Sequence, residues 1–159
     1  MAAQRISTES TVRVTGLKEA VRALKKCGDA EKLGLLKETF HQAAKLVVRE
    51  AQGTAVFVSP MASRAASRLK ASKVQNAAQV IFSERKGYEF GAEFGAGRNL
   101  PRSGHRGGTY YTYAGLNQFK PWLGNGTGAG YFLWPSIRAE SEHIAEMVGD
   151  EMERIFEKG

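Results

Sequence analysis

Apolar residues recur at intervals of three and four positions in two long stretches of this chain, and this spacing constrains the fold more than any other feature. In the first stretch it predicts a helix over residues 30–52, with Asp29 as its N-cap and with Gly53 and Thr54 ending it. In the second it predicts a helix over residues 135–156, whose acidic residues lie mostly on the outer side. Two long apolar faces must therefore be buried in the same core.

Weaker patterns predict the shorter elements. Alternating valines predict a strand, and apolar spacing predicts one more helix. A basic run predicts a short helix with Arg64 and Arg68 on its surface, and a tight turn between two apolar runs predicts a hairpin. These elements are a strand over 11–15, helices over 17–26 and 63–73, and hairpin strands over 79–83 and 88–94. The expected fold class is α+β, a small antiparallel sheet packed by two long amphipathic helices. We expect one domain over 11–159, preceded by a flexible N-terminal arm over 1–10.

Residues 95–130 differ in kind, because ten of the chain's 18 glycines lie there beside many aromatic residues. No regular structure is predicted for this stretch, and an irregular connection of such length in a compact domain usually has a function. Flexible linkers do not carry aromatic side chains at this density. We interpret residues 95–130 as an extended loop that becomes ordered against its own domain or against a partner.

The net charge of +7 is concentrated in the middle of the chain. Between Ala51 and Ala139 there are eleven basic and three acidic residues, so this segment carries +8 and the two ends together carry −1. A basic segment that also contains tyrosines and tryptophan suits nucleic acid, through phosphate contacts and base stacking. The same residue types anchor protein–protein interfaces, and no DNA-binding motif is recognisable. We therefore favour a protein interface and keep nucleic-acid binding as the alternative.

The sequence offers little for catalysis. Glu89 and Glu93 are the only acid pair of interest, and we favour a structural role for them over acid–base chemistry. One cysteine and three scattered histidines do not form a zinc cluster, and the glycine-rich run 124–129 lacks the βαβ context of a dinucleotide site. We expect no enzymatic activity, no cofactor and no metal. No apolar run is long enough for a membrane span, and synthesis in a reducing cytoplasm is expected.

Four segments follow one another along the chain. They are the strand-like 12–17 with the helix after it, the long helix that precedes Pro60, the segment 88–95 with its Glu-Phe-Gly ending, and the aromatic-Leu-Trp-Pro-Ser segment 131–137. Together, in this order, they resemble a family of tail components of long-tailed double-stranded DNA phages. The likeness covers residues 11–157. The chain departs from the family pattern where Ala-Ser-Arg-Leu at 66–69 replaces Thr-Gly-x-Leu, and in the length of its 97–130 loop.

The resemblance implies a structural virion protein at the phage head–tail junction, a neck, minor tail or tail-completion subunit that joins the tail to the DNA-filled head. It implies a homo-oligomeric ring, with six copies as the expectation, and neighbouring neck and tail proteins as partners. DNA would pass nearby. The subunit would assemble in the host cytoplasm and reside in the virion, at the neck or proximal tail.

The expected interface residues run from the end of the predicted hairpin to the start of the last helix. Within this set, we expect Glu93 and Phe94 to hold the end of the hairpin against the corner at Trp134 and Pro135. The full set is Glu93, Phe94, Arg98, Arg102, Arg106, Tyr110, Tyr111, Tyr113, Trp122, Tyr131, Phe132 and Trp134.

Overall fold

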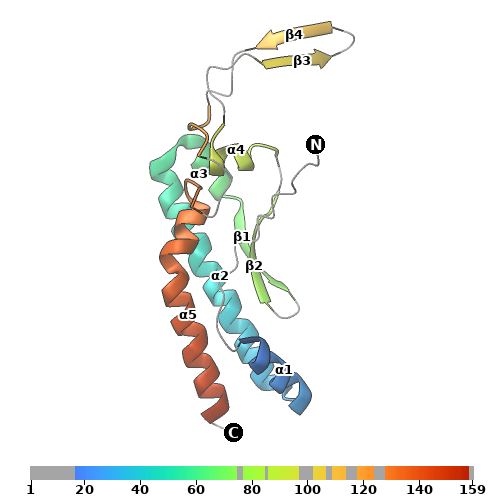
Figure 1. Cartoon of the computed structure of the whole chain (residues 1–159), viewed down its shortest axis with the longest axis vertical. Coiled ribbons are helices and arrows are strands. Elements are labelled where there is room, and N and C mark those ends of the chain that lie inside the picture. Colours follow the sequence, from blue (N-terminus) through green and yellow to red (C-terminus); the bar gives the residue numbers. More distant parts are fainter. Residues whose placement is uncertain are drawn as a thin grey trace.

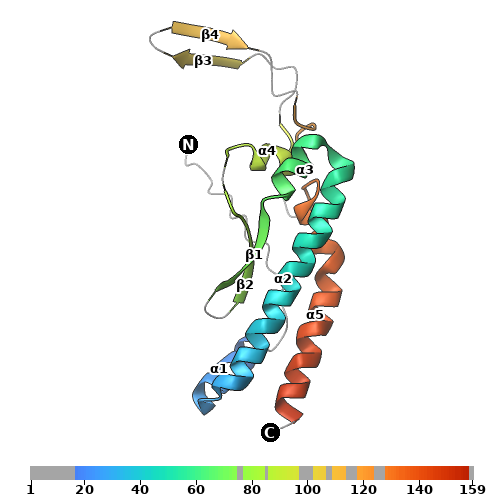
Figure 2. The same cartoon turned by 180° about the vertical axis from the view of Figure 1, so that it is seen from behind.

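A computed structural model describes residues 17–74, 77–84, 86–96, 102–106, 109–113, 118–123 and 128–157. Two long helices lie along each other, with a shorter helix and a two-stranded sheet against them (Figures 1 and 2). The helices are α1 (Leu17–Cys27), α2 (Ala30–Val58), α3 (Pro60–Ala66), α4 (Glu89–Phe94) and α5 (Leu133–Glu157). The strands are β1 (Leu69–Val74), β2 (Ala77–Phe82), β3 (Arg102–Arg106) and β4 (Thr109–Tyr113). The predicted α+β class is confirmed.

Helix α2 begins as predicted, since the Asp29 side chain accepts a hydrogen bond from the Lys32 N–H at 3.0 Å. The predicted end at residue 52 is wrong, because the helix continues through Gly53 to Val58. Glycine inside a helix costs only about 1 kcal/mol, and complete burial of Ala51 and Ala55 on either side offsets it. The helix ends at Ser59, whose extended backbone is what a following proline requires.

The prediction of a basic helix over 63–73 is also wrong. The helix is α3, which begins at Pro60, with the Ser59 hydroxyl accepting a hydrogen bond from the Ala62 N–H at 3.0 Å. It ends at Ala66, and residues 69–74 form β1 instead. Ala62, Ala65 and Ala66 are buried, and longer side chains would prevent this close approach of α3 to its neighbours.

The predicted strand over 79–83 is confirmed as part of β2, but its predicted partner is wrong. β2 pairs with the preceding β1, from Leu69 opposite Phe82 to Val74 opposite Ala77. Residues 89–94 form the short helix α4, not a returning strand. Aromatic residues at positions 88, 90 and 94 do not separate a short strand from a short helix. Here the segment is a helix that buries Ala92 in the cluster formed with α3, and Phe94 beside the rings of Phe90 and Trp122.

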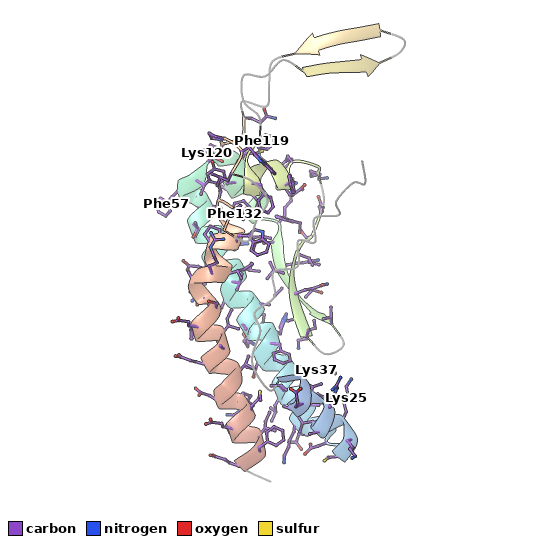
Figure 3. All side chains as sticks on the ribbon, in the orientation of Figure 1. Lys25, Lys37, Phe57, Phe119, Lys120 and Phe132 are labelled. Carbon is purple, nitrogen blue, oxygen red and sulfur yellow. The ribbon has the colours of Figure 1, made fainter. Side chains whose placement is uncertain are left out.

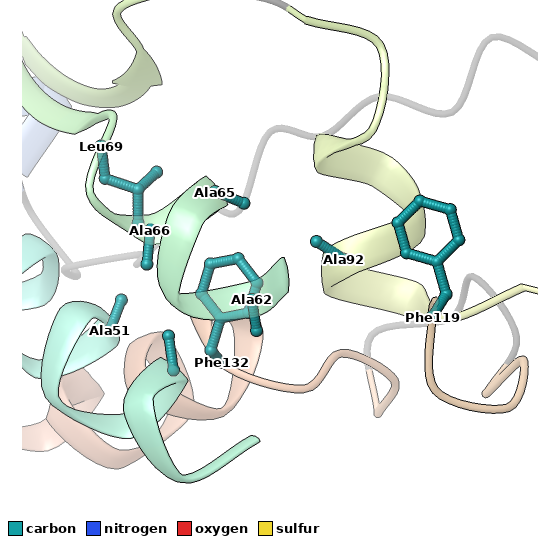
Figure 4. Close-up of a cluster of buried hydrophobic side chains, with 9 residues drawn as sticks. Ala51, Ala62, Ala65, Ala66, Leu69, Ala92, Phe119 and Phe132 are labelled. Carbon is teal, nitrogen blue, oxygen red and sulfur yellow. The ribbon is translucent and has the colours of Figure 1, made fainter. Parts of the chain in front are cut away.

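The core has two parts along α2. Near α1 and the C-terminal half of α5 it is built of aliphatic side chains, including Leu24, Leu36, Val47, Ile144 and Val148. At the other end α2, α3 and α4 meet the start of α5, and alanines surround the fully buried Phe132 ring (Figure 4). This alanine-rich end is the one that carries the candidate site.

The predicted irregular loop contains an antiparallel hairpin. Strands β3 and β4 pair from Arg102 opposite Tyr113 to Arg106 opposite Thr109, and we call this hairpin, residues 102–113, the arm. Threonine and tyrosine, which form all of β4, favour extended backbone, and that signal was present in the sequence. The arm stands away from the helices, beyond the end formed by α3 and α4 (Figures 1 and 2). The predicted flexible N-terminal arm and the strand over 11–15 lie outside the described residues.

Candidate interface at the base of the arm

The base of the arm is organised around the carboxylate of Glu93. This side chain is only 2% exposed and points from α4 at the first turn of α5. Its Oε2 accepts hydrogen bonds from the N–H groups of Phe132 at 3.2 Å and Leu133 at 2.8 Å, and its Oε1 accepts one from Trp134 at 2.8 Å. The N-terminal N–H groups of a helix have no partner within it, so Glu93 acts as a cap supplied from a distant part of the chain.

Burial raises the pKa of Glu93, while the three backbone N–H donors and the nearby positive charge of Arg138 oppose that rise. All of the hydrogen bonds described for this carboxylate come from the protein backbone. Such an arrangement joins two elements and leaves little capacity for acid–base work on a substrate. The structural interpretation of Glu93 made from the sequence agrees with this geometry.

Backbone hydrogen bonds extend this joint to both sides of the arm. The Glu93 carbonyl accepts from the Tyr131 N–H at 2.7 Å, and the Phe94 carbonyl accepts from the Leu123 N–H at 2.9 Å. The Ala96 N–H donates to the Lys120 carbonyl at 2.9 Å. The segments that leave and re-enter the helical body are therefore tied to each other and to α4. We call the bonded residues 93–96, 120–123 and 131–134 the clasp.

Two glycines allow the clasp to close. Gly95 has φ of +82° and Gly130 has φ of +98°, a region that other residues rarely adopt. A Cβ atom at Gly95 would overlap the Pro121 carbonyl, and one at Gly130 would overlap the Glu93 carboxylate. Both positions therefore need glycine for conformation and for space. The sequence showed that glycines gather here, but not which of them are required.

Aromatic rings cover the outer side of the clasp. The Phe90 ring centroid lies 4.9 Å from that of Phe94 and 5.7 Å from that of Trp122, and the rings are tilted towards one another. Phe94 is buried, whereas Phe90, Trp122 and the adjacent Leu123 are 41%, 46% and 48% exposed. We call these three exposed residues the aromatic patch. Contiguous exposed apolar side chains of this size are typical of interaction sites.

The second acid of the predicted pair, Glu89, is also buried and also serves the backbone. Its Oε1 and Oε2 accept from the N–H groups of Lys86 at 2.6 Å and Gly87 at 2.9 Å, and Arg68 lies 3.6 Å from Oε1. The Arg68 guanidinium also lies 5.1 Å from the centre of the Tyr88 ring. Glu89 and Glu93 thus fix the two ends of α4, and they lie four residues apart on a helix instead of the predicted strand.

The predicted interface residues have different positions. Glu93, Phe94 and Phe132 are buried inside the chain, so their predicted role as direct contacts is corrected to that of internal supports. Glu93 does hold the Trp134 corner, as predicted, although from α4 and not from a hairpin end.

The other predicted residues that the structure describes lie either in the clasp or on the two strands of the arm. Trp122 is exposed, and Tyr131 and Trp134 are half-buried, with the Tyr131 hydroxyl donating to the Pro121 carbonyl at 2.8 Å. Arg98 lies outside the described residues. Only backbone is described for Arg102, Arg106, Tyr110, Tyr111 and Tyr113, which β3 and β4 bring together on the arm.

Sequence reasoning missed Phe90 and Leu123. Phe90 precedes Phe94 by four positions, which places both rings on one side of a helix, but the segment was predicted to be a strand. Leu123 follows Trp122 in an irregular stretch, where no periodicity indicates which side chains are exposed. The signal for Phe90 was thus present and was interpreted with the wrong period.

No family model, curated protein or solved structure matches this chain. Within the described residues, no group of acidic, histidine or cysteine side chains is arranged to hold a metal ion. No helix in the same part of the chain has the length and apolarity to cross a membrane.

Proposed function

We propose that this protein is a non-enzymatic structural subunit of a tailed phage virion, at the neck or as a tail-completion protein, that works in an oligomeric ring joining the tail to the head. The observation that carries the proposal is the clasp, which anchors a projecting arm and displays the aromatic patch beside it. A rigid anchor, an extended hairpin and exposed aromatic side chains together suit binding between protein subunits.

The residues that serve this role divide between support and contact. Glu93, Phe94 and Phe132 set the position of the arm from inside the fold. The aromatic patch supplies the apolar contact, and the arm adds basic and aromatic residue types. The phage assignment is supported by four sequence segments that resemble those of tail components and occur in the same order along the chain, from residues 12–17 to residues 131–137.

A genetic complementation experiment tests the proposal. A phage lacking this gene is supplied with the wild-type protein or with Trp122→Asp, and purified particles are examined by electron microscopy and mass spectrometry. We expect wild-type protein in the virion and tails joined to heads. We expect Trp122→Asp to give separate heads and tails, because Trp122 is 46% exposed and its loss leaves the core intact. Wild-type protein that is absent from joined particles would refute the proposal.

Nucleic-acid binding is the second candidate, and one observation favours it. The register of the arm places Arg102 opposite Tyr113 and His105 opposite Tyr110, so phosphate-binding and stacking residue types are neighbours across the strands. A titration of the protein with DNA at increasing salt distinguishes the two. Tight binding at physiological salt that Arg102→Glu abolishes would support this candidate, whereas weak binding that salt removes supports the structural role.

A further inference from the structure

The outer side of α5 carries a line of acidic side chains. At about 100° per residue these positions fall within roughly 80° of one another around the helix. They are Glu142, Glu146, Asp150, Glu153 and Glu157, all exposed, and we call them the acidic stripe. The other two acids of α5 have partners, since Glu140 lies 3.1 Å from His143 and Glu151 lies 2.7 Å from Arg154. Across the described residues, the acidic stripe makes no ion pair.

Like charges four residues apart destabilise a helix, and the acidic stripe repeats that spacing. α5 as a whole has seven acidic and two basic residues, hence −5, in a chain whose net charge is +7. The acidic side chains on this face of the helix therefore repel one another, and no basic side chain of the described residues forms an ion pair with them. A positively charged partner surface would remove this repulsion.

Helix α1 offers the opposite charge. Arg22, Lys25 and Lys26 are exposed on it and fall within roughly 100° of one another around the helix, and we call these three residues the basic face. α1 has four basic residues and one acid, Glu19, hence +3. Like the acidic stripe, the basic face makes no ion pair in the part of the chain that the structure describes. Figure 3 places Lys25 and Lys37 together at this end of the molecule.

The two charged faces lie on opposite sides of the same body. α1 and α5 both pack on α2, and Leu24 of α1 shares a core cluster with Ile155 of α5. Figures 1 and 2 show α1 and α5 flanking the N-terminal half of α2 from either side. Among the described residues no ion pair joins the basic face to the acidic stripe, so one molecule presents both charged surfaces.

We infer that the basic face of α1 binds the acidic stripe of α5 of a second copy of this chain. Two different surfaces meet in such a contact, so it is head-to-tail, repeats from copy to copy, and closes into a ring when the rotation permits. Phe156, 48% exposed beside the acidic stripe, adds an apolar contact to the ionic ones. This inference rests on the proposed function and identifies the contact surfaces of its ring.

Paired charge reversals test the contact in the full chain. One variant, Glu146→Lys with Asp150→Lys, changes the charge of the acidic stripe from −5 to −1, and the other, Arg22→Glu with Lys25→Glu, changes that of the basic face from +3 to −1. Self-association is measured by analytical ultracentrifugation over a range of protein and salt concentrations. We expect wild-type association that weakens as salt rises, and at least about tenfold weaker association for each variant. Exposed acids away from the acidic stripe provide the matched control, Glu50→Lys with Glu84→Lys, which should associate as wild type.

Mixing the two reversed chains is the decisive step. The variant with the altered acidic stripe keeps its basic face, and the variant with the altered basic face keeps its acidic stripe. An equimolar mixture should therefore form a heterodimer through these two unaltered faces, although neither variant associates alone. A wild-type chain that stays monomeric at low salt, or a mixture that is not rescued, overturns the inference. Loss of DNA binding in Arg22→Glu/Lys25→Glu with unchanged self-association does so too, and assigns the basic face to nucleic acid. Virion incorporation is scored separately, so wild-type protein found in joined particles upholds the proposed function even if the contact fails.

Discussion

The carboxylate of Glu93 connects more of the site than any other single group. The carboxylate joins α4 to the start of α5. The backbone carbonyl of the same residue accepts a hydrogen bond from the Tyr131 N–H. A buried acceptor that serves three donors is expensive to replace, because each donor left without a partner loses its solvation as well as its bond. The stability of the clasp should therefore depend strongly on this one buried side chain.

Replacing Glu93 by glutamine tests this dependence. The amide keeps the shape of the carboxylate but places an NH₂ group against backbone N–H donors, so we expect a loss of about 1–3 kcal/mol in the free energy of unfolding. Denaturant unfolding followed by circular dichroism measures it. Glu142 is exposed on α5, the helix that Glu93 caps, and Glu142→Gln should change the free energy of unfolding by less than about 0.5 kcal/mol. Equal effects at the two positions would contradict the capping role.

Glu89 makes a prediction about acid stability. Burial disfavours its charge, but the backbone N–H groups of Lys86, Gly87 and Glu89 itself, together with Arg68, outweigh burial and lower its pKa. A carboxyl with a lowered folded-state pKa stabilises the fold above its unfolded pKa, and this contribution is lost as pH falls through the folded value. Glu89→Gln should therefore flatten the fall in melting temperature on the acid side. Glu38→Gln, at an exposed ion pair with Lys73, should flatten it less.

Gly95 and Gly53 predict opposite results for the same substitution. Gly95→Ala meets both a positive φ and the Pro121 carbonyl, so we expect a loss of about 1–3 kcal/mol or more. Gly53→Ala lies inside α2 with no atom within 4 Å of the added methyl group, so we expect a gain of about 0.5–1 kcal/mol. Thermal unfolding of the two variants measures the contrast, and unchanged or raised stability in Gly95→Ala would show that the clasp does not need glycine at this position.

At the scale of elements, sequence periodicity correctly predicted the helices that bury one face along their length. The existence of α1, α2 and α5 followed from apolar spacing, because each buries one side against its neighbours. The identity of α4 and β1 did not, since short segments take the structure that their partners favour. Leu69 pairs with Phe82 and Ala92 packs against α3, and neither partner could be read from local sequence.

The site itself was predictable in outline only. Glycine and aromatic density marked residues 95–130, which supply only part of it, and the Glu93 contact with the Trp134 corner was predicted. The sequence could not show that Phe94 and Phe132 face inwards, because burial depends on which elements meet there. Residue type predicted an interface in this region, and only the packing of α4 on the start of α5 separated supporting from exposed side chains.

The clasp predicts that the arm is not needed for folding. Ala96 and Lys120 are joined by a backbone hydrogen bond, so the chain positions on either side of the arm are already adjacent. Replacing residues 97–117 by a short Gly-Ser linker should therefore leave the melting temperature within about 5 °C of wild type, since loop length has a weak effect on stability. A cooperative loss of helical signal at much lower temperature would show that the arm supports the core.

For the whole molecule, the two proposals use different ends: contact between copies would involve α1 and the acidic stripe of α5, and contact with other proteins would involve the clasp and the arm. The chain with residues 97–117 replaced separates them. We expect it to self-associate as wild type, because the basic face and the acidic stripe are unchanged, and to leave heads and tails unjoined in the complementation experiment. Sedimentation and electron microscopy of the same preparation measure both outcomes. Joined particles would remove the arm from the function, and loss of self-association would place the contact between copies at the arm instead of at α1 and α5.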